Sequence, residues 1–99
     1  MGYTVNQICR AALDNFGSEA QIDMCIEECA ELINALEKYR RGRVSKMDVI
    51  TEIADVQIMC EQMQELFGDE DTNKERMRKW NRLVERMEKR GIIIKRIEL

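Results

Sequence analysis

Residues 18–39 read SEAQIDMCIEECAELINALEKY, and their apolar side chains recur every three or four positions. This spacing places the apolar side chains on one face of an amphipathic helix. Glu28 falls inside that face, at a position where a bundle helix normally carries a hydrophobic residue. Glu31 follows one turn later, about 60° away around the helix axis. The stretch therefore predicts a helix that carries acidic side chains on or beside its buried face.

Residues 46–67, KMDVITEIADVQIMCEQMQELF, repeat this arrangement, with Glu52 inside an apolar face and Asp55 one turn later. If the two faces pack together, four carboxylates converge. Burying a carboxylate costs solvation free energy, and like charges at close range add to that cost. We therefore expect either partial protonation of these groups or a cation that compensates them. A ligand set made only of oxygen atoms suits Mg²⁺, with Mn²⁺ as the alternative.

Capping signals predict where the first two helices begin and end. Thr4 is placed to cap a first helix, and Gly17 is placed to end it. Ser18 and Gln21 have the spacing of a capping box, in which the two side chains satisfy each other's backbone N–H groups. This box is expected to begin the second helix, which runs to about Tyr39.

Similar signals predict two further helices and a short tail. Ser45 is expected to cap the third helix. Residues 69–71 are expected to form an acidic loop, followed by a capping box of Thr72 and Glu75 at the start of a fourth helix. The β-branched residues 92–94 follow as a tail that forms a short strand or seals a partner subunit. The predicted fold class is all-α, a four-helix bundle.

Composition supports this fold and excludes several functions. A chain of 99 residues has room for one domain, residues 1–99, and the absence of proline favours long helices. The net charge of −3 is no signature of nucleic-acid or anionic-membrane binding. No apolar run approaches the roughly 20 residues of a membrane span, and no secretory signal is recognised. Four cysteines without a C-x-x-C pair fit a reduced, cytoplasmic chain.

The complete absence of histidine narrows the chemistry further. It removes the Ser-His and Cys-His nucleophile systems. It also excludes a di-iron bundle built on Glu-x-x-His motifs.

The acidic motifs resemble those of a known family. Glu27-Glu28-Cys29-Ala30-Glu31, followed after twenty residues by Glu52-Ile53-Ala54-Asp55, is similar to the E-E-x-x-E…E-x-x-D signature of MazG-like all-α nucleoside triphosphate pyrophosphohydrolases. Lys79-Trp80-Asn81-Arg82-Leu83 is similar to the basic segment of the family's fourth helix. The resemblance covers about residues 18–90 and is to small members of phage and Firmicute type.

The resemblance implies Mg²⁺-dependent hydrolysis of a nucleoside triphosphate to the monophosphate and pyrophosphate. It also implies homo-oligomers, either dimers or dimers of dimers. Carried over by position, the metal ligands are Glu28, Glu31, Glu52 and Asp55. Glu27 matches the first glutamate of the motif, where it orients water, touches an additional ion, or is simply a solvated surface charge.

The predicted fourth helix supplies the positive charge that such a substrate needs. Residues 74–90 carry 8 basic and 3 acidic side chains, whereas residues 1–73 carry 6 and 15. Arginine binds phosphate through two parallel hydrogen bonds and lysine through a point charge. With the resemblance, Lys79 and Arg82 are interpreted as phosphate contacts, and Arg86 as part of a solvated face. Gln21 is the candidate for a hydrogen bond to the base edge, in competition with its capping role.

Two other classes of function remain open at this point. One is a non-catalytic helical oligomerisation or regulatory module, which keeps the fold and performs no chemistry. The other is a protein that binds a nucleotide or an ion without cleaving it. Base and sugar preference are not determined by these motifs.

Overall fold

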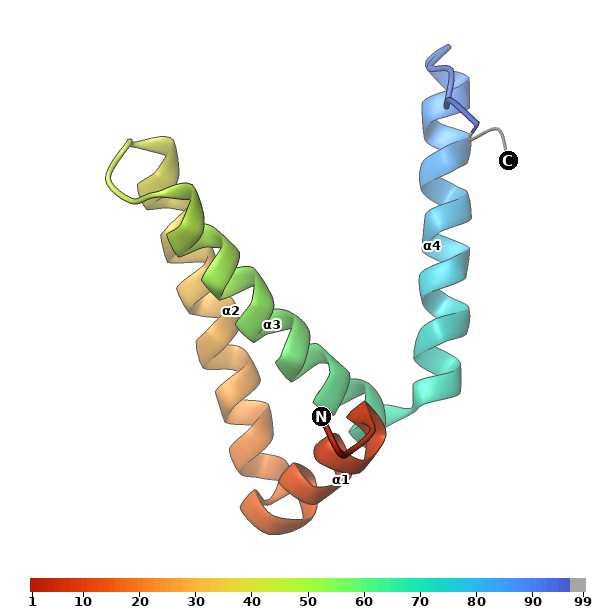
Figure 1. Cartoon of the computed structure of the whole chain (residues 1–99). Coiled ribbons are helices and arrows are strands. Elements are labelled where there is room, and N and C mark those ends of the chain that lie inside the picture. Colours follow the sequence, from red (N-terminus) through yellow and green to blue (C-terminus); the bar gives the residue numbers. More distant parts are fainter. Residues whose placement is uncertain (97–99) are drawn as a thin grey trace. The chain divides into compact units, whose positions relative to one another are not determined.

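The computed structural model describes residues 1–96, and all regular structure in that range is helical. Its elements are α1 (Val5–Phe16), α2 (Ser18–Arg40), α3 (Lys46–Phe67) and α4 (Asp69–Lys89) (Figure 1). The predicted all-α fold class is therefore confirmed for the described part of the chain. None of these helices combines the length and apolar character that crossing a bilayer requires.

Helices α1 and α3 begin at the predicted caps Thr4 and Ser45, and in the structure each cap is part of a capping box. The Gln7 N–H donates to Thr4 Oγ1 at 3.1 Å, and the Thr4 N–H donates to Gln7 Oε1 at 2.9 Å. At α3, the Asp48 N–H donates to Ser45 Oγ at 3.2 Å, and the Ser45 N–H donates to Asp48 Oδ2 at 2.8 Å. These bonds satisfy backbone donors that have no partner within the helix.

The expected capping box at the start of α2 is wrong. Helix α2 follows Gly17 directly and has no side-chain cap. Gln21 cannot serve as a cap because its side chain is buried and donates to Gln62 of α3 at 2.6 Å. Gln21 therefore bonds to Gln62, a distant residue in the sequence, instead of to Ser18.

The expected acidic loop before α4 is also wrong. Residues 69–71 are helical and form the first turn of α4. Negative side chains in the first turn interact favourably with the partial positive charge at a helix N-terminus. The acidic run therefore favours an earlier start of the helix rather than a loop.

Residues Met1–Gly68 form one compact unit. In it α2 and α3 lie side by side and antiparallel, and α1 packs against both (Figure 1). The connection between α2 and α3 turns at Gly42, whose φ of 70° suits a residue without a Cβ. The core is small and consists of the buried side chains Cys9, Leu13, Ala35, Val49 and Met59.

A second unit begins at Asp69 and, among the described residues, consists of α4 and residues 90–96. The helix ends in a Schellman motif: the Ile92 N–H donates to the Met87 carbonyl and the Gly91 N–H to the Glu88 carbonyl, both at 3.0 Å. Residues 92–96 form no strand, so the strand option for the tail is not realised there. Residues 97–99 of the tail lie outside the described residues, and one domain over 1–99 stays a prediction.

Candidate metal centre

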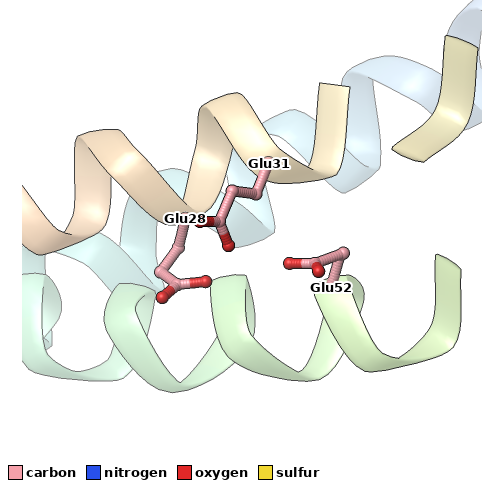
Figure 2. Close-up of side chains that lie close together, drawn as sticks. All are labelled: Glu28, Glu31 and Glu52. Carbon is pink, nitrogen blue, oxygen red and sulfur yellow. The ribbon is translucent and has the colours of Figure 1, made fainter. Parts of the chain in front are cut away.

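Three glutamates from α2 and α3 bring their carboxylates together. Glu28, Glu31 and Glu52 each place one carboxylate oxygen so that the three oxygens lie within 4.8 Å of one another. Figure 2 shows Glu28 and Glu31 extending from α2 toward Glu52, which rises from α3. Glu28 and Glu52 are half-buried, whereas Glu31 is exposed. The structure thus brings together three of the four ligands that the sequence predicts.

Two oxygens of this acidic trio have no hydrogen-bond partner in the part of the chain that the structure describes. Glu28 Oε2 and Glu52 Oε2 are both buried, and neither accepts a hydrogen bond from the described residues. Buried polar atoms in folded proteins are nearly always paired, because an unpaired one loses its hydration without replacement. A hard divalent cation, which prefers carboxylate oxygen ligands, fits these two atoms.

The electrostatics at Glu28 and Glu52 are unfavourable to negative charge. Burial raises the pKa of Glu28 above its usual value, and the charges of Glu31, Asp55 and Glu52 raise it further. Burial likewise raises the pKa of Glu52, with added contributions from Glu31 and Asp55. The causes of both shifts are burial and acidic neighbours.

The fourth predicted ligand, Asp55, lies at the edge of the trio. Its charge acts on both Glu28 and Glu52, so it is a close neighbour of each. Its carboxylate is nevertheless outside the set of oxygens that lie within 4.8 Å. An aspartate side chain is one methylene shorter than a glutamate and reaches less far from the helix. A direct bond from Asp55 to the ion stays a prediction.

Two further predicted residues lie on α2 at different depths. Glu27 precedes Glu28 and is exposed, and its role in orienting water or touching an additional ion stays a prediction. Gln21 lies two turns before Glu28 and retains only 7% of its exposure. Its partner Gln62, which is 8% exposed, was not anticipated by the sequence analysis. Gln62 lies three positions after the buried Met59 and so shares its face of α3. This helical spacing is the sequence signal that could have predicted the burial of Gln62.

The predicted phosphate contacts lie in the second unit. Lys79 and Arg82 are exposed on α4. Lys79 lines a shallow depression of about 310 Å³ together with Arg76, Trp80 and Leu83. The Trp80 indole and two cationic side chains, Arg76 and Lys79, therefore share this surface. The proximity of Lys79 and Arg82 to the acidic trio stays a prediction.

Comparisons of the chain with protein-family models, curated proteins and solved structures found no match. The resemblance to MazG-like enzymes therefore rests on the paired acidic motifs and the basic segment of α4.

Proposed function

We propose that this chain is a Mg²⁺-dependent nucleoside triphosphate pyrophosphohydrolase of MazG-like type. Water cleaves a ribo- or deoxynucleoside triphosphate to the monophosphate and pyrophosphate. One observation carries the proposal: α2 and α3 bring three carboxylates together, and Glu28 Oε2 and Glu52 Oε2 are buried without a hydrogen-bond partner among residues 1–96. The motif resemblance supplies the reaction class.

The acidic residues divide the work at the reacting end of the substrate. Glu28, Glu31 and Glu52 hold the ion, and Asp55 completes the set directly or through water. Bound Mg²⁺, or Mn²⁺ in its place, neutralises phosphate oxygens and lowers the pKa of a bound water. Glu27 is exposed next to this set and is assigned the orientation of the attacking water.

Residues outside the trio bind the remainder of the substrate. Lys79 and Arg82 are assigned to the outer phosphates, whose negative charge a single ion leaves partly uncompensated. Gln21 is assigned to the base edge. Because Gln21 is buried and donates to Gln62, this contact requires the pair to open when substrate binds.

The active form is proposed to be a homodimer or a dimer of dimers. Large apolar side chains on α2 and α3 support this, since Ile26, Ile33 and Ile58 are 63%, 60% and 58% exposed. Large apolar side chains that stay exposed on a folded unit are candidates for burial in a protein interface. Light scattering on the purified chain is expected to give two or four times the mass of 11.7 kDa.

The decisive experiment is a product assay across ribo-, deoxy- and modified nucleoside triphosphates. With Mg²⁺ the wild type is expected to release pyrophosphate and monophosphate in equal amounts. Glu28→Gln and Asp55→Asn should abolish turnover while leaving helicity intact, and Glu37→Gln, which changes an exposed glutamate of α2, should not. Full activity in the first two variants contradicts the assignment.

The same assay separates the other classes of function. Nucleotide binding with no monophosphate product would favour a protein that binds without cleaving. If neither product nor any Mg²⁺-dependent change in melting temperature appears, the chain is a structural or regulatory module.

A further inference from the structure

The basic side chains of the first unit gather at the end of the helix pair where the chain turns from α2 into α3 (Figure 1). Residues 1–68 contain 12 acidic and 6 basic side chains. The sixth basic residue, Arg10, is paired with Asp14 at 3.5 Å and with Glu65 at 3.1 Å. The other five lie within residues 38–46 and are here called the basic turn: Lys38, Arg40, Arg41, Arg43 and Lys46.

The basic turn has no acidic partner among residues 1–96. Its five cationic side chains are exposed, and none of them forms an ion pair in that part of the chain. Asp48, the nearest acidic residue of α3 in the sequence, accepts hydrogen bonds from the Ser45 N–H at 2.8 Å and from the Ser45 hydroxyl at 2.9 Å. The positive charge of the basic turn is therefore available to an anion from outside the chain.

Hydrogen bonds hold the backbone of the basic turn in one conformation. Helix α2 ends in a Schellman motif, in which the Arg43 N–H donates to the Lys38 carbonyl and the Gly42 N–H donates to the Tyr39 carbonyl, both at 2.9 Å. The cationic side chains are therefore carried by fixed backbone positions. A ligand that binds them does not have to order a loop first, which lowers the entropic cost of binding.

One residue of the basic turn shares a face of α2 with the acidic trio. Lys38 follows Glu31 by seven positions, which is about 20° short of two turns and about 10 Å along the helix axis. Side chains of a helix lean toward its N-terminus, so the Lys38 stem leans toward Glu31. Asn34 and Ala35, which lie between them, carry no charge. Arg40 follows Glu31 by nine positions and so lies on the opposite face of α2.

We propose that Lys38 binds the terminal phosphate of the substrate and so selects a chain of three phosphates over a chain of two. This rests on the proposed function, in which an ion on the acidic trio binds the phosphate under attack. The far end of a triphosphate lies beyond that ion and still carries negative charge. A lysine ammonium is a compact charge on a flexible stem, which suits a terminal phosphate. A diphosphate is one phosphate shorter and ends before Lys38.

This role adds to the contacts assigned to Lys79 and Arg82. Those two residues belong to the second unit, whereas Lys38 lies on the helix that also carries Glu28 and Glu31. The spacing between Lys38 and the ion is therefore set by α2 itself.

The test measures the binding of inorganic phosphate chains, so it requires no turnover. Isothermal titration calorimetry with saturating Mg²⁺ compares tripolyphosphate with pyrophosphate on the full chain. Lys38→Gln is expected to lose about tenfold or more in affinity for tripolyphosphate and little in affinity for pyrophosphate, because only the longer chain reaches the lysine. Lys38→Arg keeps the charge and should retain the affinity of the wild type for tripolyphosphate.

Arg40→Gln is the matched control, because it removes the same charge from the opposite face of α2. It should bind both phosphate chains as the wild type does, and circular dichroism checks that each variant folds. Equal losses in Lys38→Gln and Arg40→Gln would show that net charge alone attracts phosphate, and this would overturn the assignment of Lys38. An equal loss for both phosphate chains in Lys38→Gln, or a wild type that binds neither chain, would overturn it as well.

The outcome can be separated from that of the proposed function. Pyrophosphate release from nucleoside triphosphates by the wild type decides the hydrolase activity. If the wild type is active and Lys38→Gln keeps both affinities, only the role of Lys38 is wrong. If no nucleotide is cleaved but Lys38→Gln loses affinity for tripolyphosphate alone, Lys38 binds the phosphate chain and the assigned reaction is wrong.

Discussion

Glu28 on α2 and Glu52 on α3 face each other, and each buries one carboxylate oxygen that has no hydrogen-bond partner among the described residues. Burial and neighbouring acidic charges raise the pKa of both groups. Like-charged groups held together in this way destabilise the metal-free fold, because the energy of their repulsion is released on unfolding. The arrangement is physically reasonable if a cation binds between them.

Removing the charge of Glu28 or Glu52 should raise the melting temperature of the metal-free protein and reduce the stabilisation that bound metal provides. Glu28→Gln and Glu52→Gln are expected to melt at a higher temperature than the wild type when metal is absent. Saturating Mg²⁺ should raise the wild-type melting temperature by about 10 °C, since a ligand at 100 times its Kd contributes about 2.7 kcal/mol. Both variants should lose most of that shift.

Differential scanning fluorimetry with and without Mg²⁺ measures these temperatures. Glu37→Gln is the matched control, because it removes an exposed charge from the same helix. It should keep the wild-type response. Equal Mg²⁺ shifts in all four proteins would show that the ion acts elsewhere.

The pH dependence of stability has a definite sign. Because the pKa values of Glu28 and Glu52 are raised by burial and by their acidic neighbours, the folded state binds protons more readily than the unfolded state. The metal-free protein should therefore become more stable as pH falls from neutrality through the folded pKa values, toward the unfolded value of about 4.3. Urea unfolding at a series of pH values measures this.

At pH values below this range, the free energy of unfolding should fall again as the pH is lowered further. The hydrogen bonds from the backbone and side chain of Ser45 hold the pKa of Asp48 below its usual value, so its stabilising contribution is lost as Asp48 becomes protonated. In the double variant Glu28→Gln/Glu52→Gln, the free energy of unfolding should change little with pH above pH 4.5. The loss of stability at lower pH, which is assigned to Asp48, should be the same as in the wild type. A double variant with the full wild-type profile would contradict the assigned groups.

The buried pair of Gln21 and Gln62 offers a test of the α2–α3 register. Gln21→Leu leaves the Gln62 amide buried without its partner and should cost about 1–3 kcal/mol in the free energy of unfolding. Gln21→Leu/Gln62→Leu replaces both polar groups and should recover much of that loss. Urea denaturation of the single and double variants gives the coupling free energy between the Gln21 and Gln62 side chains. Strict additivity of the two single changes would argue against the contact.

The proposed phosphate contacts predict a separation of kinetic constants. Lys79→Gln and Arg82→Gln should each raise KM for the triphosphate about tenfold or more, because a hydrogen bond to a charged group contributes about 1.5–3 kcal/mol. Neither change should alter the metal-induced melting shift, since neither residue is assigned to the ion. Lys89→Gln, at the end of the same helix, is the control. If steady-state kinetics give all three variants the KM of the wild type, the side chains of α4 do not bind the substrate.

Local signals in the sequence predict the starts of α1 and α3 but not those of α2 and α4. Thr4 and Ser45 cap their helices because each bonds to a residue three positions away, and that spacing is visible in the sequence. Ser18 and Gln21 show the same spacing, yet Gln21 bonds to Gln62 across the helix pair. A partner 41 positions away leaves no trace in a single sequence, so this prediction failed.

The site could be predicted because its geometry is helical. Glu28 and Glu52 each fall inside an apolar face, and two such faces pack together, so their convergence follows from periodicity. The depth of the site was overestimated. Met24 and Leu36, which flank Glu28 on the same helix, remain 41% and 44% exposed, and Glu31 is exposed as well. A single chain of this size has too few apolar side chains in contact to enclose the carboxylates fully.

The most direct test of the metal centre is a crystal structure of the protein grown with Mn²⁺, with the ion located by its anomalous scattering. The account predicts a peak between α2 and α3, bonded to carboxylate oxygens of Glu28, Glu31 and Glu52 at about 2.2 Å, with Asp55 beside it. A fully occupied peak elsewhere, or an empty site whose carboxylates point apart into solvent, would contradict it.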